Sequence, residues 1–317
     1  MGRFLLAVQI GTAMFAATVS PELRREVDRN PRTTVLVEVQ AGPMVYDALR
    51  GRLGDYCHIR TPLPTAGAAI VETDGPCLDR LAKDPSIRTI DLPASGFFAA
   101  ADSLPVGRRH EAIALIGEGV PPPDYPSGSR FPTLAQACFG TCPNGPDSAS
   151  TESVNRTTET ALYRQVYLGN AQLGDGLNLG LVVARVGSPN RPVSLADAIE
   201  ALDWIHRDHP RITSVYLSIE TSQAFCSACD SSTLTNRILA SYVKALRNRS
   251  VRIFAPWFGP RVRGAPACLE GVERFPASTD PPQFDQQLQL SGTVVGVLQE
   301  IQASVQATDR GLKSIVL

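Results

Sequence analysis

The sequence predicts an α/β fold with a parallel β-sheet, preceded by a smaller α+β unit. Short, wholly apolar runs such as Ala112–Ile116 and Leu179–Val186 are typical of strands that are buried on both faces of a parallel sheet. From residue 179 to residue 255, predicted strands alternate with two amphipathic helices, as crossover connections require. A shorter alternation of strand and helix before residue 94 predicts a separate small unit.

The first 20 residues have the pattern of a secretory signal peptide. Met1-Gly2-Arg3 gives a basic start, an uncharged run follows, and small residues stand at its end. We therefore expect a secreted or periplasmic protein, with no membrane span after removal of the signal. The alternatives are a buried first helix and an uncleaved membrane anchor.

Residues 33–93 form the predicted small unit. Its order of elements favours a split βαβ, ferredoxin-like sandwich. Residues 94–109 are small and polar with Gly and Pro, which predicts a linker. The expected strands are Thr33–Gln40, Ala68–Glu72 and Ile87–Leu92, and the expected helices are Met44–Leu53 and Pro76–Lys83.

Residues 110–280 form the predicted large unit. Ser194 is placed to cap its clearest helix. Residues 121–157 are rich in Pro, Gly and Ser and are expected to be irregular, whereas apolar residues at helical spacing predict a C-terminal helical segment over 281–317. Besides the two apolar runs above, the expected strands are Ile212–Ser218 and Val251–Ala255, and the helices are Ser194–His206 and Leu234–Asn248.

The charge composition argues against a nucleic-acid-binding protein. The 317 residues carry 30 basic and 31 acidic side chains, whereas a nucleic-acid-binding protein would need an excess of positive charge. No Gly-rich phosphate loop and no metal-ligand cluster is evident, so we expect neither a cofactor nor a metal.

The seven cysteines fit an oxidising compartment and are candidates for disulfides. An odd number leaves at least one outside an intramolecular pair. Two further interpretations remain open: a four-thiolate zinc site from the Cys138/Cys142 and Cys226/Cys229 pairs, and a redox site at Cys226 and Cys229. The seven are Cys57, Cys77, Cys138, Cys142, Cys226, Cys229 and Cys268.

Several blocks, in the same order along the chain, resemble those of the subtilisin-like serine proteases, or subtilases. The resemblance implies an inhibitor-type prodomain followed in the chain by a three-layer α/β protease domain. The segment Leu78–Pro93 resembles the end of such a prodomain. In the large unit, Ile113–Val120 resembles the strand that carries the catalytic Asp, and Thr158–Tyr163 the helix start at the His. Further blocks are Val215–Glu220, similar to the Ser-x-Gly edge strand, Val251–Gly259, similar to the strand before the oxyanion Asn, and Cys268–Ser278.

The catalytic positions of the family are degenerate in this chain. The Asp position falls on Gly117, the His position on Thr158 and the nucleophile position on Val294. Loss of one triad member typically removes a factor of about 10⁴ in rate, so the resemblance implies a pseudoprotease. The alternative is an active subtilisin-like serine endopeptidase with divergent motifs, which would be recognised by a Ser–His pair within hydrogen-bond reach.

No histidine is evidently placed to replace the missing base. His58 falls in the small unit, and His110 lies at the amino end of the first core strand. His206 and His209 lie at the end of a helix, on the wrong side of the sheet.

The resemblance implies a peptide groove beside Ser218, Ile219 and Glu220. Subtilases add an extended peptide as a strand there, but Glu220 replaces a Gly that lets the backbone approach closely. We therefore expect a peptide or protein partner, with the prodomain-like unit still attached and available to plug the groove. A third hypothesis is a hydrolase that uses Glu118 and Glu220, although solvated loop acids are the simpler expectation.

Overall fold

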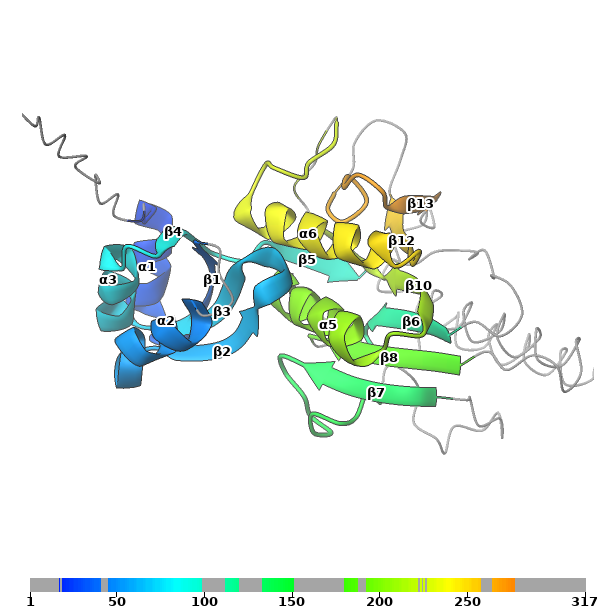
Figure 1. Ribbon diagram of the computed structural model, residues 1–317, viewed down its shortest axis with the longest axis horizontal. Coiled ribbons are helices and arrows are strands. Elements are labelled where there is room, and N and C mark those ends of the chain that lie inside the picture. The colour runs from blue at the N-terminus through cyan, green and yellow to red at the C-terminus, as the bar shows by residue number, and fades with distance from the viewer. Residues whose placement is uncertain are drawn as a thin grey trace, which may run out of the picture. The chain divides into compact units, whose positions relative to one another are not determined.

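The computed structural model describes residue 17 and residues 19–40, 45–98, 112–119, 133–150, 180–187, 192–221, 223, 225, 227–257 and 264–276. The chain divides after Pro93 into two compact units, which we call the N-terminal unit and the C-terminal unit. Figure 1 labels most of their helices and strands.

The N-terminal unit is a ferredoxin-like sandwich, as predicted. Its four strands pair antiparallel in the order β2-β3-β1-β4, and the chain order β1-α2-β2-β3-α3-β4 is that of a split βαβ fold. The helices are α1 (Pro21–Arg29), α2 (Val45–Leu53) and α3 (Gly75–Lys83); the strands are β1 (Thr33–Val39), β2 (His58–Leu63), β3 (Ala68–Thr73) and β4 (Ile87–Asp91).

The core of this unit lies between the sheet and its helices. Alternate residues of β1, such as Val35 and Val37, point to one face, where they meet apolar residues of α2 and α3 such as Leu49 and Leu78. Helix α1 adds Leu23 to the same cluster. The core is therefore built from the apolar sides of amphipathic elements.

Helix α1 and strand β2 lie where we expected no regular element. Ser20 caps α1 by accepting a hydrogen bond from the Leu23 N–H (3.0 Å), and Pro21 occupies the first turn, so the start signals were present in the sequence. Strand β2, HIRTPL, lacks apolar alternation and contains Pro62, which an edge strand tolerates.

The end of the apolar N-terminal segment belongs to the folded N-terminal unit. Ala17 is buried, and its N–H donates to the carbonyl of Ala82 (3.1 Å), while Val19 packs against the core. The rest of the segment, residues 1–16 and 18, lies outside the described residues, as does the predicted helical segment 281–317.

The C-terminal unit contains the predicted parallel sheet. Six strands run in the order β13-β12-β10-β6-β8-β7, and every neighbouring pair is parallel. Helices α5 and α6 lie side by side over one face (Figure 1). The strands are β6 (Ala112–Gly117), β7 (Thr133–Phe139), β8 (Gly180–Val186), β10 (Ile212–Leu217), β12 (Arg252–Trp257) and β13 (Glu273–Pro276); the helices are α5 (Leu195–Asp208) and α6 (Leu234–Asn248).

The two helices begin where their capping residues predict. Ser194 accepts from the Ala196 N–H at the start of α5, and Thr233 accepts from the Asn236 N–H at the start of α6. The buried hydroxyl of Tyr242 donates to Asp203 (2.7 Å) and joins α6 to α5. These helices form the described helical layer of the α/β sandwich.

Two expectations for irregular segments are wrong in part. Strand β7 lies inside the stretch 121–157, and β5 (Ser95–Phe98) lies inside the predicted linker 94–109. Strand β5 is the centre of a second, antiparallel sheet of order β11-β5-β9, with β9 (Val193–Ser194) and β11 (Ile219–Thr221). Strand β5 has only four residues, one of them glycine, which is too short for an alternating apolar pattern to be recognised in the sequence.

Candidate functional site

The carboxyl ends of β6, β8 and β10 meet at one edge of the parallel sheet. Gly117, the last residue of β6, is in register with Arg185 of β8. Ser218 follows β10, and its N–H donates to the carbonyl of Ile116 (2.9 Å). Ligands of parallel sheets bind at this edge, so these residues define the candidate site.

The turn after β6 is closed and buried. Gly119 has φ +106°, and a Cβ there would lie 2.1 Å from the carbonyl oxygen of Ala149, so only glycine fits. The Arg185 guanidinium donates to the carbonyl of Ser150, which holds the loop after β7 against this turn. Glu118 is 1% exposed, which corrects the expectation of a solvated loop acid.

Glu220 is also buried, at 4% exposure, and it anchors a neighbouring loop. Its Oε1 accepts a hydrogen bond from the Gly264 N–H (3.1 Å). Beside it, Thr221 and Ala265 exchange two hydrogen bonds of 2.8 Å. One edge of β11 is therefore fixed to residues 264–265, and the Glu220 carboxylate serves this attachment rather than facing solvent.

The other edge of β11 is occupied by β5. Phe98, Phe97 and Gly96 lie opposite Ile219, Glu220 and Thr221, respectively. Gly96 also pairs with Val193 of β9. Just before β5, the Ala94 carbonyl accepts from the Leu195 N–H (3.0 Å), and the Ala94 N–H donates to Thr235 (3.1 Å). The groove candidate therefore holds a segment of the chain itself.

Three disulfides decide the cysteine hypotheses. Cys57 pairs with Cys77, Cys138 with Cys142, and Cys229 with Cys268. These pairs rule out the four-thiolate zinc site and the redox pair of Cys226 with Cys229, because three of the four thiols in question are bonded otherwise. Cys226 lies outside the described residues.

The Cys229–Cys268 disulfide is connected to β11 through the backbone near Gly264. The Cys229 N–H donates to the carbonyl of Cys268 (3.3 Å), and the Cys268 N–H donates to the carbonyl of Gly264 (3.0 Å). Gly264 in turn contacts Glu220 of β11. The disulfide thus ties the loop before α6 to the residues that hold β11.

Comparisons with known proteins identify the fold. No protein-family model and no curated protein sequence matches the chain. The crystal structure of the epidermin leader peptide processing serine protease EpiP from Staphylococcus aureus matches with a TM-score of 0.51 at 12% identity, over 77% of this chain and 68% of that chain. Its S393A mutant matches with a TM-score of 0.50 at 11% identity, over 77% and 69%.

The protein has a subtilase-like fold. At such low identity the likeness shows the fold alone, so roles of individual residues in this subtilase-like chain rest on its own sequence and geometry.

The subtilase-like unit places only one of the three predicted triad positions among the described residues. Gly117 lies at the end of β6, whereas Thr158 and Val294 lie outside the described residues, as does His110. His206 and His209 lie at the end of α5, where the His209 carbonyl accepts from the N–H of Ile212 at the start of β10. They are therefore at the opposite end of the strands from the candidate site.

The described part of the subtilase-like chain contains no group of three or more His, Cys, Asp or Glu side chains that could hold a metal ion. Within the same residues, no helix has the length and hydropathy to cross a membrane. His58 belongs to β2 of the N-terminal unit, whereas the candidate site belongs to the C-terminal unit.

Proposed function

We propose that the protein is a secreted, non-catalytic subtilase-like protein that binds an extended peptide or protein segment between β9 and β11. One observation carries this proposal: β5 lies in that groove as the central strand of an antiparallel sheet. Strand addition recognises a segment mainly through its main chain. A groove that holds Ser95–Phe98 in this way suits other extended segments.

The turn after β6 supports the absence of catalysis. The resemblance assigns Gly117 to the position of the catalytic Asp, and a glycine there has no side chain to orient a base. The neighbouring Glu118 is buried, and the carbonyl of Ala149 covers Gly119 closely. With Thr158 and Val294 at the other two positions, the resemblance implies that none of the three catalytic groups remains.

The occupied groove supports a regulated, latent binder. The prodomain-like N-terminal unit ends just before β5, and without self-cleavage the two stay covalently joined. On its other side, β5 is tethered to β6 through residues 99–111, and a tether of this length gives β5 an effective concentration on the order of millimolar. An external segment therefore binds only where it displaces β5.

The disulfides support the proposed secreted or periplasmic location. Cross-links of this kind persist in oxidising compartments and are rare in the cytosol. Thiol titration of the denatured, unreduced protein, purified from the culture medium or periplasm, tests this point. Six protected thiols are expected, whereas free thiols at these cysteines would argue against export.

Labelling with a fluorophosphonate probe tests the absence of catalysis. Native and heat-denatured protein are treated with the probe, subtilisin serves as positive control, and a cooperative melting transition shows that the protein is folded. We expect no specific labelling of the native chain. Specific labelling would favour the alternative, an active serine endopeptidase, and the modified serine would identify its nucleophile.

A further inference from the structure

Gly96 is the most confined residue of β5. It pairs with Thr221 of β11 on one side and with Val193 of β9 on the other, so both edges of the strand are occupied at this position. Its own surface is buried. Whatever strand fills this groove must pass between the same two neighbours.

A side chain at this position has no space. A Cβ on Gly96 would lie 2.8 Å from the carbonyl oxygen of Glu220, 3.0 Å from Ile219 Cγ2 and 3.1 Å from Leu195 Cδ1. The first contact is with backbone of β11, which is fixed on its far edge by residues 264–265. The backbone of Gly96 is not in the left-handed region, so the requirement for glycine comes from space alone.

The two walls beside Gly96 have little freedom to move. Ile219 and Leu195 are each 1% exposed, and Leu195 is the first residue of α5, whose N–H is bonded to Ala94. Close-packed side chains of this kind resist an added methyl group.

The neighbouring positions of β5 are more exposed than Gly96. Ser95 is exposed, and Phe97 is 42% exposed although it is a large apolar side chain. Alternate residues of a strand point to opposite faces, so a peptide in this groove presents the side chains flanking its glycine away from the wall.

We propose that the groove selects extended peptides with glycine at the position of Gly96 and imposes little restriction on the residues at the positions of Ser95 and Phe97. This inference rests on the proposed binding function and defines its ligand class. The groove selects by steric exclusion, because a residue larger than glycine clashes with the backbone of β11.

The test uses the full-length chain with the substitution Gly96→Leu, which prevents β5 from entering the groove. Fluorescein-labelled Ala-Ser-Gly-Phe-Phe, the sequence of residues 94–98, is titrated and followed by anisotropy. The same peptide with Val in place of Gly, and one with Glu at the Phe97 position, are titrated alongside. The matched control variant is Phe97→Ser, in which β5 stays in place and gains no binding.

We expect the Gly peptide and the Glu-containing peptide to bind Gly96→Leu with affinities within a few-fold of each other, and the Val peptide to bind at least ~10-fold more weakly. Equal binding of the Gly and Val peptides would overturn the glycine requirement while leaving the binding function intact. Binding of none of them to a folded Gly96→Leu protein would refute the binding function itself.

Hydrogen exchange on the unaltered chain gives a second test if Gly96→Leu does not fold. An excess of the Gly peptide should displace β5 and accelerate exchange of the Phe97 and Phe98 amides at least ~10-fold more than the Val peptide does. Equal acceleration by both peptides would again overturn the inference, and no acceleration by either would count against binding.

Discussion

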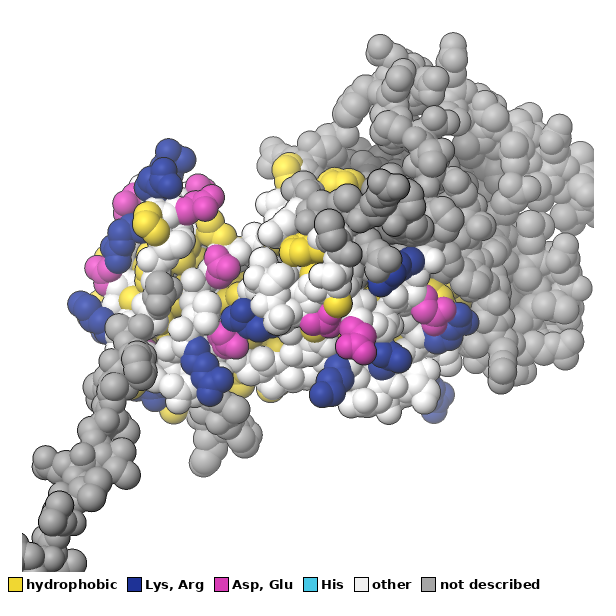
Figure 2. All heavy atoms as spheres, turned by 90° about the horizontal axis from the view of Figure 1, so that it is seen from above, with side chains coloured by type: hydrophobic (Ala, Val, Ile, Leu, Met, Phe, Trp, Pro, Cys, Tyr) yellow, Lys and Arg dark blue, Asp and Glu magenta, His cyan; other side chains and the backbone are white. Residues whose placement is uncertain are grey.

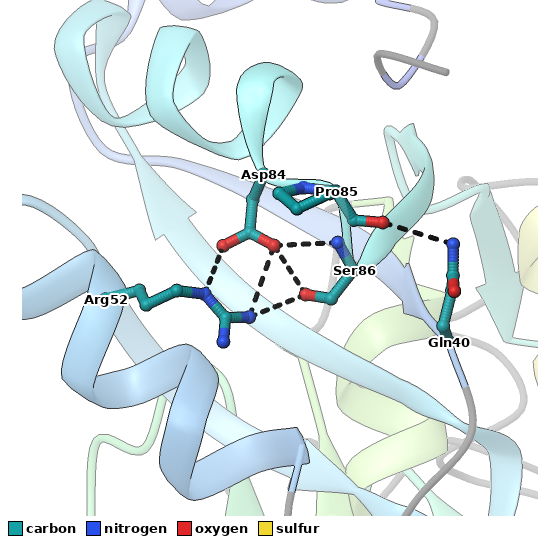
Figure 3. A network of polar contacts seen from close by, with 5 residues as sticks. All are labelled: Gln40, Arg52, Asp84, Pro85 and Ser86. Carbon is teal, nitrogen blue, oxygen red and sulfur yellow. Dashed lines mark hydrogen bonds and ion pairs between the residues drawn. The ribbon is translucent and has the colours of Figure 1, made fainter. Parts of the chain in front are cut away.

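Asp84 shows how one buried carboxylate fixes the N-terminal unit at the residue scale (Figure 3). Its Oδ2 accepts from Arg52 Nε at 2.8 Å, and its Oδ1 accepts from the N–H and the hydroxyl of Ser86 at 2.8 and 2.5 Å. Burial by itself raises the pKa of Asp84, but the bonds from Arg52 and Ser86 outweigh it and leave the pKa below its ordinary value. The carboxylate thus joins α2 to the turn between α3 and β4.

Asp84→Ala is expected to lower the free energy of unfolding of the N-terminal unit by about 1–3 kcal/mol, because it removes a buried carboxylate that accepts hydrogen bonds from Arg52 and Ser86. The shift of the urea midpoint measures this effect. Asp79→Ala is the matched control, since its ion pair with Arg24 is exposed and should leave the midpoint unchanged. Equal shifts for both variants would contradict the role of burial.

His206 and His209 are expected to make the stability of the C-terminal unit depend on pH. Burial lowers the pKa of both rings below the ordinary value of about 6.5, and Arg249 lowers that of His206 further. Their contribution is fully present above about pH 6.5. As the pH falls from there, the unfolded chain takes up protons before the folded chain does, so stability decreases.

His209→Gln should make this decrease shallower, because one titrating ring is removed while a polar group is kept. Guanidinium midpoints at pH 7.5 and 5.5 measure it in both proteins. A parallel loss of stability in the variant and the unaltered chain would rule His209 out as a source of the pH dependence.

At the scale of elements, a helix or strand could be predicted from the sequence where the residues that determine it are close together in the chain. Helix α6 was predicted with the correct bounds, because its apolar spacing and its cap are local. Strand β7, TLAQACF, alternates only weakly and lies in a stretch rich in Pro and Gly. Strand β5 exists through pairing with residues 97 to 125 positions further along the chain, which no local pattern encodes.

The same difference between local and long-range determinants applies to the candidate site. Ser218, Ile219 and Glu220 were predicted as a groove, and the structure places Ile219 and Glu220 in β11 next to β5. The occupant and the anchoring role of Glu220 were not predictable, because the bond from Gly264 joins residues 44 positions apart. The substitution of glycine by Glu220 raised doubt about close approach, yet the side chain points to the loop and leaves the strand edge paired.

The disulfides should contribute unequally to stability. Cys229–Cys268 closes a loop with a sequence separation of 39, whereas Cys138–Cys142 spans only 4. Loop-closure entropy assigns the first on the order of 4 kcal/mol and the second about 2 kcal/mol. The double variant Cys229→Ser/Cys268→Ser should therefore melt at a lower temperature than Cys138→Ser/Cys142→Ser, as calorimetry measures. The reverse order would show that native-state contacts of the shorter loop dominate.

At the scale of the whole molecule, positive and negative charges nearly balance. The net charge is -1, and on the face shown in Figure 2 basic and acidic side chains are interspersed rather than gathered by sign. Recognition through the main chain in a narrow groove needs no such patch, which agrees with the proposed strand addition.

The position of β5 in the chain predicts how latency responds to cleavage. Strand β5 is tethered on both sides: through Pro93 to the N-terminal unit, and through residues 99–111 to β6. A protease site inserted between Pro93 and Ala94 cuts only the first tether. The second keeps β5 at an effective concentration on the order of millimolar, because closure entropy grows slowly with length.

The singly cut protein should therefore bind the labelled Ala-Ser-Gly-Phe-Phe peptide no better than the intact chain does. A second protease site is inserted between Phe98 and Ala99. Once both sites are cut, peptide binding should increase, because residues 94–98 then dissociate from the groove. Anisotropy titrations before and after each cut measure this. A gain in binding after the first cut alone would mean that the N-terminal unit, and not the tether to β6, holds β5 in its groove.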